Sequence, residues 1–200
     1  MNNFIREPTE QVPMPPVPHD DDSLDMFIGW LLKPPGYRHY DLISRNPEPK
    51  DFGEWTTKPW PFMEFCSKLC KRTPRIFEKT ISEFFGILGG QVSLSNRGAD
   101  DAIDAFWSTR SGNYIIQCKR WGRDRKVGTP VVREVFGALS DFRVTRSLKG
   151  AFIITTSDFP SNAIIFASDL QPPVGLINGM ELFHLMYKIA PDMVKRIQEE

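Results

Sequence analysis

A chain of 200 residues, with 40% apolar residues and fifteen Phe, can bury one core, so we expect one folded domain with an extension. Three cysteines exclude a disulfide-rich secreted scaffold and favour a reducing, cytoplasmic setting. The sequence has no basic-then-apolar signal pattern and no apolar run of about 18 residues, so we expect no membrane span.

The net charge of zero conceals two segments of opposite sign. Residues 1–64 hold eleven acidic and six basic residues, a net charge of −5, whereas residues 117–150 hold nine basic and three acidic residues, a net charge of +6. The basic segment could bind a polyanion such as a nucleic acid, or it could be an ordinary solvated surface.

Residues 1–60 are predicted to form a proline-rich, acidic extension that is partly disordered or wraps around the domain. The run "PMPPVPHDDD" predicts a disordered or extended arm over the first 25 residues, because proline lacks an amide donor and the acidic residues repel one another. The following "MFIGWLL" could form a short anchoring helix. Residues 61–200 are predicted to form the folded domain.

Helical and strand patterns alternate from residue 62 onward. Thr73 followed by Pro74 is typical of a helix N-cap, and Gly89-Gly90 ends the helical spacing that follows. The expected helices are 62–71, 74–88, one from 129, 161–168 and 179–187, and the expected strands are 91–95, 102–109, 114–119, 150–156 and 174–178. From Thr73 this order predicts an α/β fold in which a mixed sheet is flanked by helices.

Three polar side chains, Asp104, Gln117 and Lys119, occupy two predicted neighbouring strands, where such residues are uncommon. A two-residue turn at Ser111-Gly112, or a four-residue loop around it, pairs Asp104 with Lys119 and Phe106 with Gln117. Directly opposed residues of an antiparallel pair point to the same face, so all three polar side chains would project together. A three-residue loop would instead break the cluster.

These residue types suit a hard cation such as Mg²⁺, which takes oxygen ligands and keeps several waters. Asp104 would supply a carboxylate, Gln117 a side-chain carbonyl oxygen, and Cys118 its backbone carbonyl. Lys119 would then orient a water for attack on a phosphodiester. The alternative is an ordinary Asp104–Lys119 cross-strand ion pair with an exposed Gln nearby.

Six segments between Arg75 and Met186 recur together in a known family. They read "FEKTISEFFGILGG", "GADDAID", "YIIQCKRW", "TPVVREVFGAL", "GAFIITTSDF" and "GLINGMELFHLM". In this order they resemble the Mrr-type restriction endonucleases of the PD-(D/E)xK nuclease superfamily. The resemblance implies a restriction-endonuclease-like αβββαβ core and DNA cleavage that depends on Mg²⁺, with Mn²⁺ able to substitute.

The resemblance also implies roles for single residues. Its acidic metal ligand falls on Asp104, and a Gln-x-Lys variant of its acid-x-Lys motif falls on Gln117 and Lys119. Its acidic residue on the first core helix falls on Glu78, which could also be a solvated helix charge. The chain departs from the usual glycine-rich approach at "GADDAID", which leaves open whether one of the two acids at 100–101 joins the metal site.

The segment after Lys119 is the expected DNA contact. Its basic side chains would meet phosphates, and Trp121 would stack on DNA or pack in the core. The expected phosphate-binding residues are Arg120, Arg123, Arg125 and Lys126. The hydroxyls of residues 155–157 could also touch phosphate or could cap a strand end, and Cys66 and Cys70 are read as core thiols.

The function expected from these residues is a metal-dependent DNA endonuclease of restriction or anti-phage defence. Since one active site cuts one strand, double-strand cleavage would need a homodimer or a higher homo-oligomer, and the extension could bind a partner protein. The alternatives are a Holliday-junction-type resolvase on the same core, and a catalytically silent DNA-binding or assembly subunit, which Gln117 in place of an acid keeps open.

Overall fold

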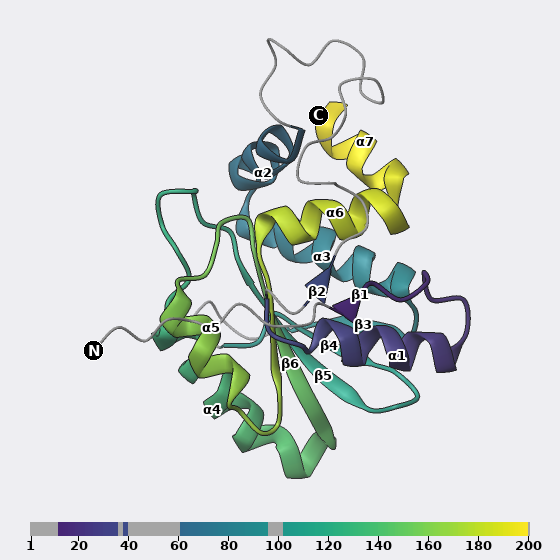
Figure 1. Cartoon of the computed structure of the whole chain (residues 1–200), viewed down its shortest axis with the longest axis vertical. Helices are drawn as coiled ribbons and strands as arrows, with labels where there is room; N and C mark the ends of the chain where they lie inside the picture. The colour runs from purple at the N-terminus through teal and green to yellow at the C-terminus, as the bar shows by residue number, and fades with distance from the viewer. Residues whose placement is uncertain (1–11, 36–37, 40–60, 96–101, 200) are drawn as a thin grey trace.

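The computed structural model describes residues 12–35, 38–39, 61–95 and 102–199, which form a sheet between two groups of helices (Figure 1). The central sheet has five strands in the order β3-β4-β5-β6-β7. Their bounds are β3 Gln91–Leu94, β4 Ala105–Ser108, β5 Asn113–Lys119, β6 Leu148–Thr155 and β7 Val174–Ile177. The strands β3, β4 and β5 pair antiparallel, whereas β5, β6 and β7 pair parallel, so the expected mixed sheet is confirmed.

Seven helices surround the strands in the described ranges, with the bounds α1 Asp21–Leu31, α2 Pro61–Lys71, α3 Pro74–Leu88, α4 Thr129–Arg146, α5 Ser161–Ser168, α6 Gly179–Ile189 and α7 Pro191–Glu199. The predicted N-cap is confirmed, since Thr73 Oγ1 accepts from the amide of Ile76 and Pro74 opens α3. In the described part of the chain, no helix is both long and apolar enough to cross a bilayer.

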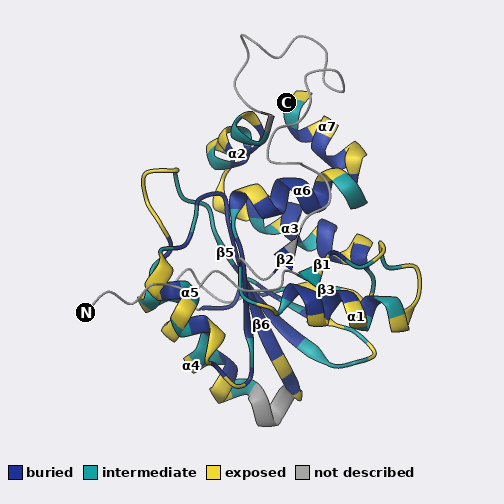
Figure 2. Cartoon of the chain, viewed as in Figure 1, coloured by how far each residue is buried: buried dark blue, intermediate teal, exposed yellow. Residues whose placement is uncertain are grey.

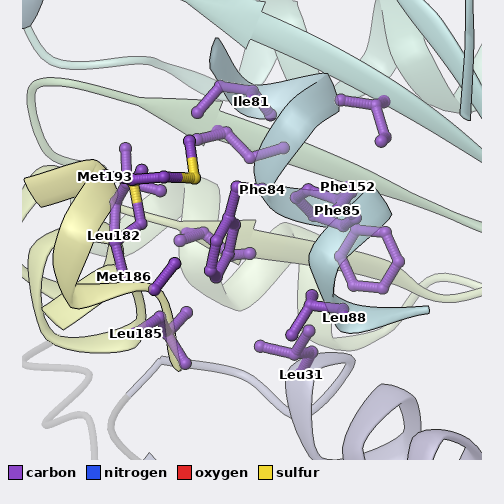
Figure 3. Packing of buried hydrophobic residues seen from close by; sticks show 14 of the residues in the cluster. Leu31, Ile81, Phe84, Phe85, Leu88, Phe152, Leu182, Leu185, Met186 and Met193 are labelled. Carbon is purple, nitrogen blue, oxygen red and sulfur yellow. The ribbon is translucent and has the colours of Figure 1, made fainter. Parts of the chain in front are cut away.

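Each face of the sheet buries its own hydrophobic cluster. The cluster against α1, α2, α3, α6 and α7 includes Trp107 and Phe152, and the cluster against α4 and α5 includes Ile115 and Ile153. Because both faces are covered, β7 is buried throughout and β6 is buried along almost its whole length, as Figure 2 shows for β6. Figure 3 shows Phe84 and Phe85 of α3 within the first cluster, where the ring of Phe85 lies 5.7 Å from that of Phe152.

Helix α1 belongs to the first cluster, where Phe27 and Leu31 are fully buried. The acidic run does not continue an extended arm up to residue 25, because Asp20 caps the helix in a reciprocal capping box with Ser23. Carboxylates at a helix N-terminus are stabilised by the helix dipole, which explains why the acidic run starts a helix here. The division at residue 60 stays a prediction, and residues 1–11 and 40–60 lie outside the described ranges.

Arg38 fixes a second piece of the extension to the core. It stands in the two-residue strand β2 (Arg38–His39), which pairs in parallel with β1 (Val12–Pro13). Its guanidinium is buried, donates to the carbonyls of Leu31 and Leu176, and lies 3.1 Å from the carboxylate of Glu181. A charge removed from water in this way must be paired, so the Arg38 pocket depends on Glu181.

The three cysteines are free thiols. Burial raises the pKa of Cys66 to about 12, and its Sγ lies 3.4 Å from the carbonyl of Gly179. Cys66 is therefore a protonated core thiol, as the sequence indicates, and Cys70 is half-buried one helical turn away.

Candidate active site

The β4–β5 hairpin brings the predicted polar residues together, but in a different register from the one expected. Ser108 pairs with Asn113 and Phe106 with Ile115 rather than with Gln117, and the side chain of Asp104, just before the ladder, contacts that of Gln117. The predicted pairing was therefore wrong by two residues. Because the side-chain period of a strand is two, a shift of two residues keeps the same face, and the predicted cluster survives.

The turn itself explains the shift. The amide of Thr109 donates to the carbonyl of Gly112 at 2.9 Å, and the amide of Gly112 donates back at 3.3 Å, so the turn is centred on Arg110 and Ser111. Gly112 has a φ of +151°, which places it just after the turn instead of inside it. The Thr109 hydroxyl also donates to the Gly112 carbonyl and so closes the loop.

Asp104 lies at the mouth of this hairpin, immediately before β4. Its Oδ2 atom accepts from the backbone amide of Cys118 at 2.6 Å and from Gln117 Nε2 at 2.8 Å. Its own amide donates to the carbonyl of Ile116, and its carbonyl accepts from the amide of Ser95. Backbone pairing with both β5 and the end of β3 therefore fixes the position of the carboxylate.

Gln117 is the buried member of the cluster, with 3% of its surface exposed. Since its amide nitrogen faces Asp104, its carbonyl oxygen Oε1 is buried and has no hydrogen-bond partner among the described residues. An orphaned oxygen of this kind is unfavourable unless a donor or a cation reaches it.

Burial raises the pKa of Asp104 to about 6, although the Cys118 amide lowers it. The negative charge of Glu78 adds to the rise, while the charges of Lys119 and Arg75 oppose it. Glu78 of α3 and Lys119 of β5 therefore both lie within electrostatic range of the Asp104 carboxylate.

The side chain of Glu78 is 18% exposed. It forms an ion pair of 3.1 Å with Arg75, one helical turn earlier. Sequence reasoning did not single out Arg75. The available signal was its position three residues before Glu78 on the predicted helix, a spacing at which side chains meet.

The site offers oxygen donors for a divalent cation. They are the carboxylates of Asp104 and Glu78, the orphaned oxygen of Gln117 and the backbone carbonyl of Cys118, which lies 3.5 Å from Gln117 Nε2. This hard donor set fits Mg²⁺ or Mn²⁺. Burial raises the pKa of the Cys118 thiol well above its usual range, so its sulfur stays protonated and is no ligand.

No cluster of three or more His, Cys, Asp and Glu side chains that could hold a metal occurs in the described ranges. The candidate site differs from such a cluster, because it combines two carboxylates with an amide and a backbone carbonyl. The acids at 100–101 lie outside the described residues.

A family model, Mrr_cat, described as a restriction endonuclease, matches residues 69–186, more than half of the chain. The chain belongs to the Mrr restriction endonuclease family. The match takes in Glu78, Asp104, Gln117 and Lys119. A comparison with curated proteins finds no match.

Two solved structures share the fold of this Mrr-family chain. The DNA modification-dependent restriction endonuclease AspBHI is 16% identical, with a TM-score of 0.55 over 71% of this chain and 40% of that one. The MspJI restriction endonuclease, solved in complex with a 27-mer oligonucleotide, is 20% identical, with a TM-score of 0.52 over 83% of this chain and 41% of that one. The chain thus spans about two fifths of the length of each structure, and identities at this level show the fold alone.

The segment after Lys119 forms a basic loop, residues 120–127, next to the candidate site. Arg120 is directed away from solvent, because its Nη1 donates to the carbonyl of Cys70 at the end of α2. Its Nε is buried and has no partner in the described part of the chain. Arg120 therefore holds α2 in place, unlike the rest of the predicted phosphate-binding set.

The other three basic residues of the loop are exposed. The guanidinium of Arg125 lies 3.8 Å from the ring centroid of Trp121, whose side chain also packs against the α4–α5 cluster. Lys126 forms an ion pair of 3.0 Å with Asp158, and Arg123 is exposed near α2. These side chains can present positive charge to a polyanion.

The hydroxyl groups of three consecutive residues bind backbone carbonyls of the basic loop and of Lys119 just before it. Residues 155–157 donate to the carbonyls of Lys119, Trp121 and Arg125 at 2.7, 2.8 and 2.6 Å, respectively. All three are buried, so they act on the loop backbone and not on a bound phosphate. Of the two roles that the sequence left open, the structure favours the structural one.

Proposed function

We propose that this chain is a Mg²⁺-dependent endodeoxyribonuclease that hydrolyses phosphodiester bonds in restriction or anti-phage defence, with Mn²⁺ able to substitute. Membership of the Mrr family supports the nuclease class. The observation that carries metal dependence is the buried Gln117 oxygen, which lacks a partner among the described residues and belongs to the side chain whose amide nitrogen donates to Asp104. A divalent cation would satisfy both groups at once.

Each residue of the site has one task in this proposal. Asp104, Gln117 and the Cys118 carbonyl hold the ion, and Glu78 completes the oxygen donors from α3. The ion, when bound, offsets the negative charge on the phosphate and lowers the pKa of a water. Lys119 orients the attacking water and stabilises charge on the phosphate, which requires an ammonium group at this point.

The DNA would be held by its phosphates. Arg123, Arg125 and Lys126 lie on the exposed side of the basic loop that begins directly after Lys119. Contacts of this kind give salt-dependent affinity with little sequence preference. Because one site cuts one strand, we propose that double-strand cleavage uses a homodimer or a higher homo-oligomer.

Plasmid nicking in Mg²⁺, Mn²⁺ or EDTA tests the proposal. The wild-type protein should nick in either metal and not in EDTA, while Asp104→Ala and Lys119→Ala should lose at least 100-fold in rate, a typical loss for a catalytic group. Lys195→Ala, which removes an exposed lysine on α7, should retain the wild-type rate. DNA binding without cleavage in any metal would overturn the proposal and assign a silent binding subunit. Cleavage restricted to four-way junctions would assign a resolvase.

A further inference from the structure

Arg75 is a charged residue beside the candidate active site that the proposed chemistry does not use. It lies in the first turn of α3, and its Nη1 is 3.1 Å from Glu78 Oε2 and 3.5 Å from the carbonyl of Ser95. The amide of Ser95 in turn donates to the carbonyl of Asp104 at 2.7 Å. Arg75 therefore contacts one acidic residue of the site and the backbone neighbour of the other.

Helix stability does not explain an arginine at this position. The N-terminus of a helix carries partial positive charge and favours acids, yet the first turn of α3 has no acidic residue and holds Arg75. Its ion pair with Glu78 spans three residues, and half of the Arg75 side chain is exposed, so solvent screens the attraction. The position of Arg75 raises the positive potential at the candidate site, although a positive charge in the first turn destabilises the helix.

The described contacts of the basic-loop residues are made with groups other than Glu78 and Asp104. Arg120 is bound to the end of α2, Arg125 lies over Trp121, and Lys126 is paired with Asp158. Among the described residues, Lys119 and Arg75 are the cations whose charge lowers the pKa of the Asp104 carboxyl. Lys119 has its role in water orientation, which leaves Arg75 for the phosphate.

We propose that Arg75 is a phosphate-contacting residue that Glu78 holds until a divalent cation is bound. When Glu78 serves the ion, the guanidinium loses its carboxylate partner and can bind the DNA phosphate at the cleavage site. The planar fork of arginine donates two parallel hydrogen bonds to phosphate oxygens, which suits this contact. This inference rests on the proposed function, since it needs both the ion and the DNA.

The test measures DNA binding instead of cleavage, in a Lys119→Met background that cannot cut. Fluorescence anisotropy with a labelled duplex, in Mg²⁺ and in EDTA, compares Arg75→Ala with Lys79→Ala, the exposed lysine of the same helix. In Mg²⁺, Arg75→Ala should weaken binding about tenfold and reduce the slope of log K against log salt by about one. In EDTA it should weaken binding at most about twofold, and Arg75→Lys should retain the wild-type salt slope.

A second experiment measures the affinity of the protein for the divalent ion. Because Arg75 competes with the cation for Glu78, Arg75→Ala should bind Mg²⁺ or Mn²⁺ several-fold more tightly in calorimetry, while Lys79→Ala should match its parent. Equal losses of DNA binding for Arg75→Ala and Lys79→Ala, or equal losses in Mg²⁺ and EDTA, would overturn the inference. An unchanged ion affinity in Arg75→Ala would overturn it as well.

Failure of the inference can be told apart from failure of the proposed function. If the protein with Lys119 intact nicks plasmid in Mg²⁺ and Arg75→Ala behaves like Lys79→Ala, the Arg75 role alone is wrong. If that protein neither nicks plasmid nor binds Mg²⁺ in calorimetry, the proposed function is wrong and the Arg75 role is wrong with it.

Discussion

Gln117 and Asp104 face each other across the β4–β5 hairpin, and the amide nitrogen of Gln117 donates to Asp104 Oδ2 at 2.8 Å. Because the amide nitrogen makes this contact, the Gln117 oxygen is left as a buried acceptor that has no donor in the described part of the chain. A buried acceptor without a partner costs about 1–3 kcal/mol. The hairpin therefore holds an unfavourable arrangement of oxygens, which is the arrangement that a bound cation would stabilise.

Gln117→Glu tests this relationship through stability. Without an ion, the new carboxylate would face Asp104 at hydrogen-bond distance, and like charges there should lower the free energy of unfolding by about 2 kcal/mol. For a chain of this size that is roughly 5 °C in Tm. With Mg²⁺ or Mn²⁺ the extra charge should tighten ion binding, so the Tm gain from metal should exceed that of the wild type. Thermal unfolding followed by circular dichroism, with metal and with EDTA, measures both effects.

The matched control for this change is Gln171→Glu, which introduces the same charge at an exposed position before β7. It should leave the Tm within about 1 °C of the wild type in EDTA and in metal, because isolated surface charges contribute little. Equal metal responses in the two variants would show that position 117 does not touch the ion.

Asp104→Asn should change stability in a pH-dependent way. The pKa of Asp104 is about 6 in the folded protein, mainly because burial disfavours its charge, against 3.8 for the ordinary side chain. The folded state therefore holds the proton more tightly, and stability is lost as the pH rises through about 6. Removing the charge should stabilise the protein by on the order of 2 kcal/mol at pH 7.5, and the gain should fade below about pH 4.

Urea unfolding of both proteins between pH 4 and 8 measures this difference. His184 titrates in the opposite sense, since burial lowers its pKa to about 4 and its stabilising effect is lost as the pH falls below about 6.5. Both proteins contain His184, so the comparison cancels its effect. A gain in Asp104→Asn that is constant across the pH range would contradict a buried, charged Asp104.

The sequence predicted the secondary structure from residue 61 onward well because its signals are local. Thr73-Pro74 begins a helix and the apolar run of β6 forms a buried strand for reasons contained in a few residues each. The shared face of Asp104, Gln117 and Lys119 was also predictable, since it depends only on the odd or even spacing between strands.

The exact pairing was not predictable, because it depends on where the turn is centred. Thr109 pairs with Gly112 in backbone hydrogen bonds, and this turn shifts the pairing of the two strands by two residues from the predicted one. Arg120 shows a second limit. Its charge fits a phosphate contact in the sequence, but the carbonyl that it binds belongs to Cys70, fifty residues earlier, and only the packing of α2 brings the two together.

Thr156→Val should loosen the basic loop without touching the ion. The substitution keeps the shape of the side chain but removes the hydroxyl that donates to the carbonyl of Trp121, a bond of 2.8 Å in a buried position. The expected loss is about 1–3 kcal/mol, because the carbonyl loses its donor. Faster limited proteolysis within residues 120–127, and weaker DNA binding with unchanged Mg²⁺ affinity, would agree with this role. A lowered Mg²⁺ affinity would contradict it.

Arg38 offers a test of how far the extension belongs to the domain. Arg38→Ala should reduce the free energy of unfolding by about 3–5 kcal/mol, because Glu181 would remain charged and buried without the guanidinium of Arg38. Glu181 also accepts from the amide of Asn178 in the capping box of α6, so its carboxylate cannot simply turn to solvent. Urea unfolding measures the loss.

The double variant Arg38→Met with Glu181→Gln separates the charge from the packing. Methionine retains apolar contact near Leu31, and the amide oxygen of glutamine can still accept from Asn178, so most of the stability should return. Recovery of this kind would show that the loss comes from the buried charge of Glu181 in the absence of the Arg38 guanidinium. If instead Arg38→Ala loses less than about 1 kcal/mol, β2 does not dock on the core in solution, and the described contacts that join the extension to the domain are those of α1 and of Met14 before it.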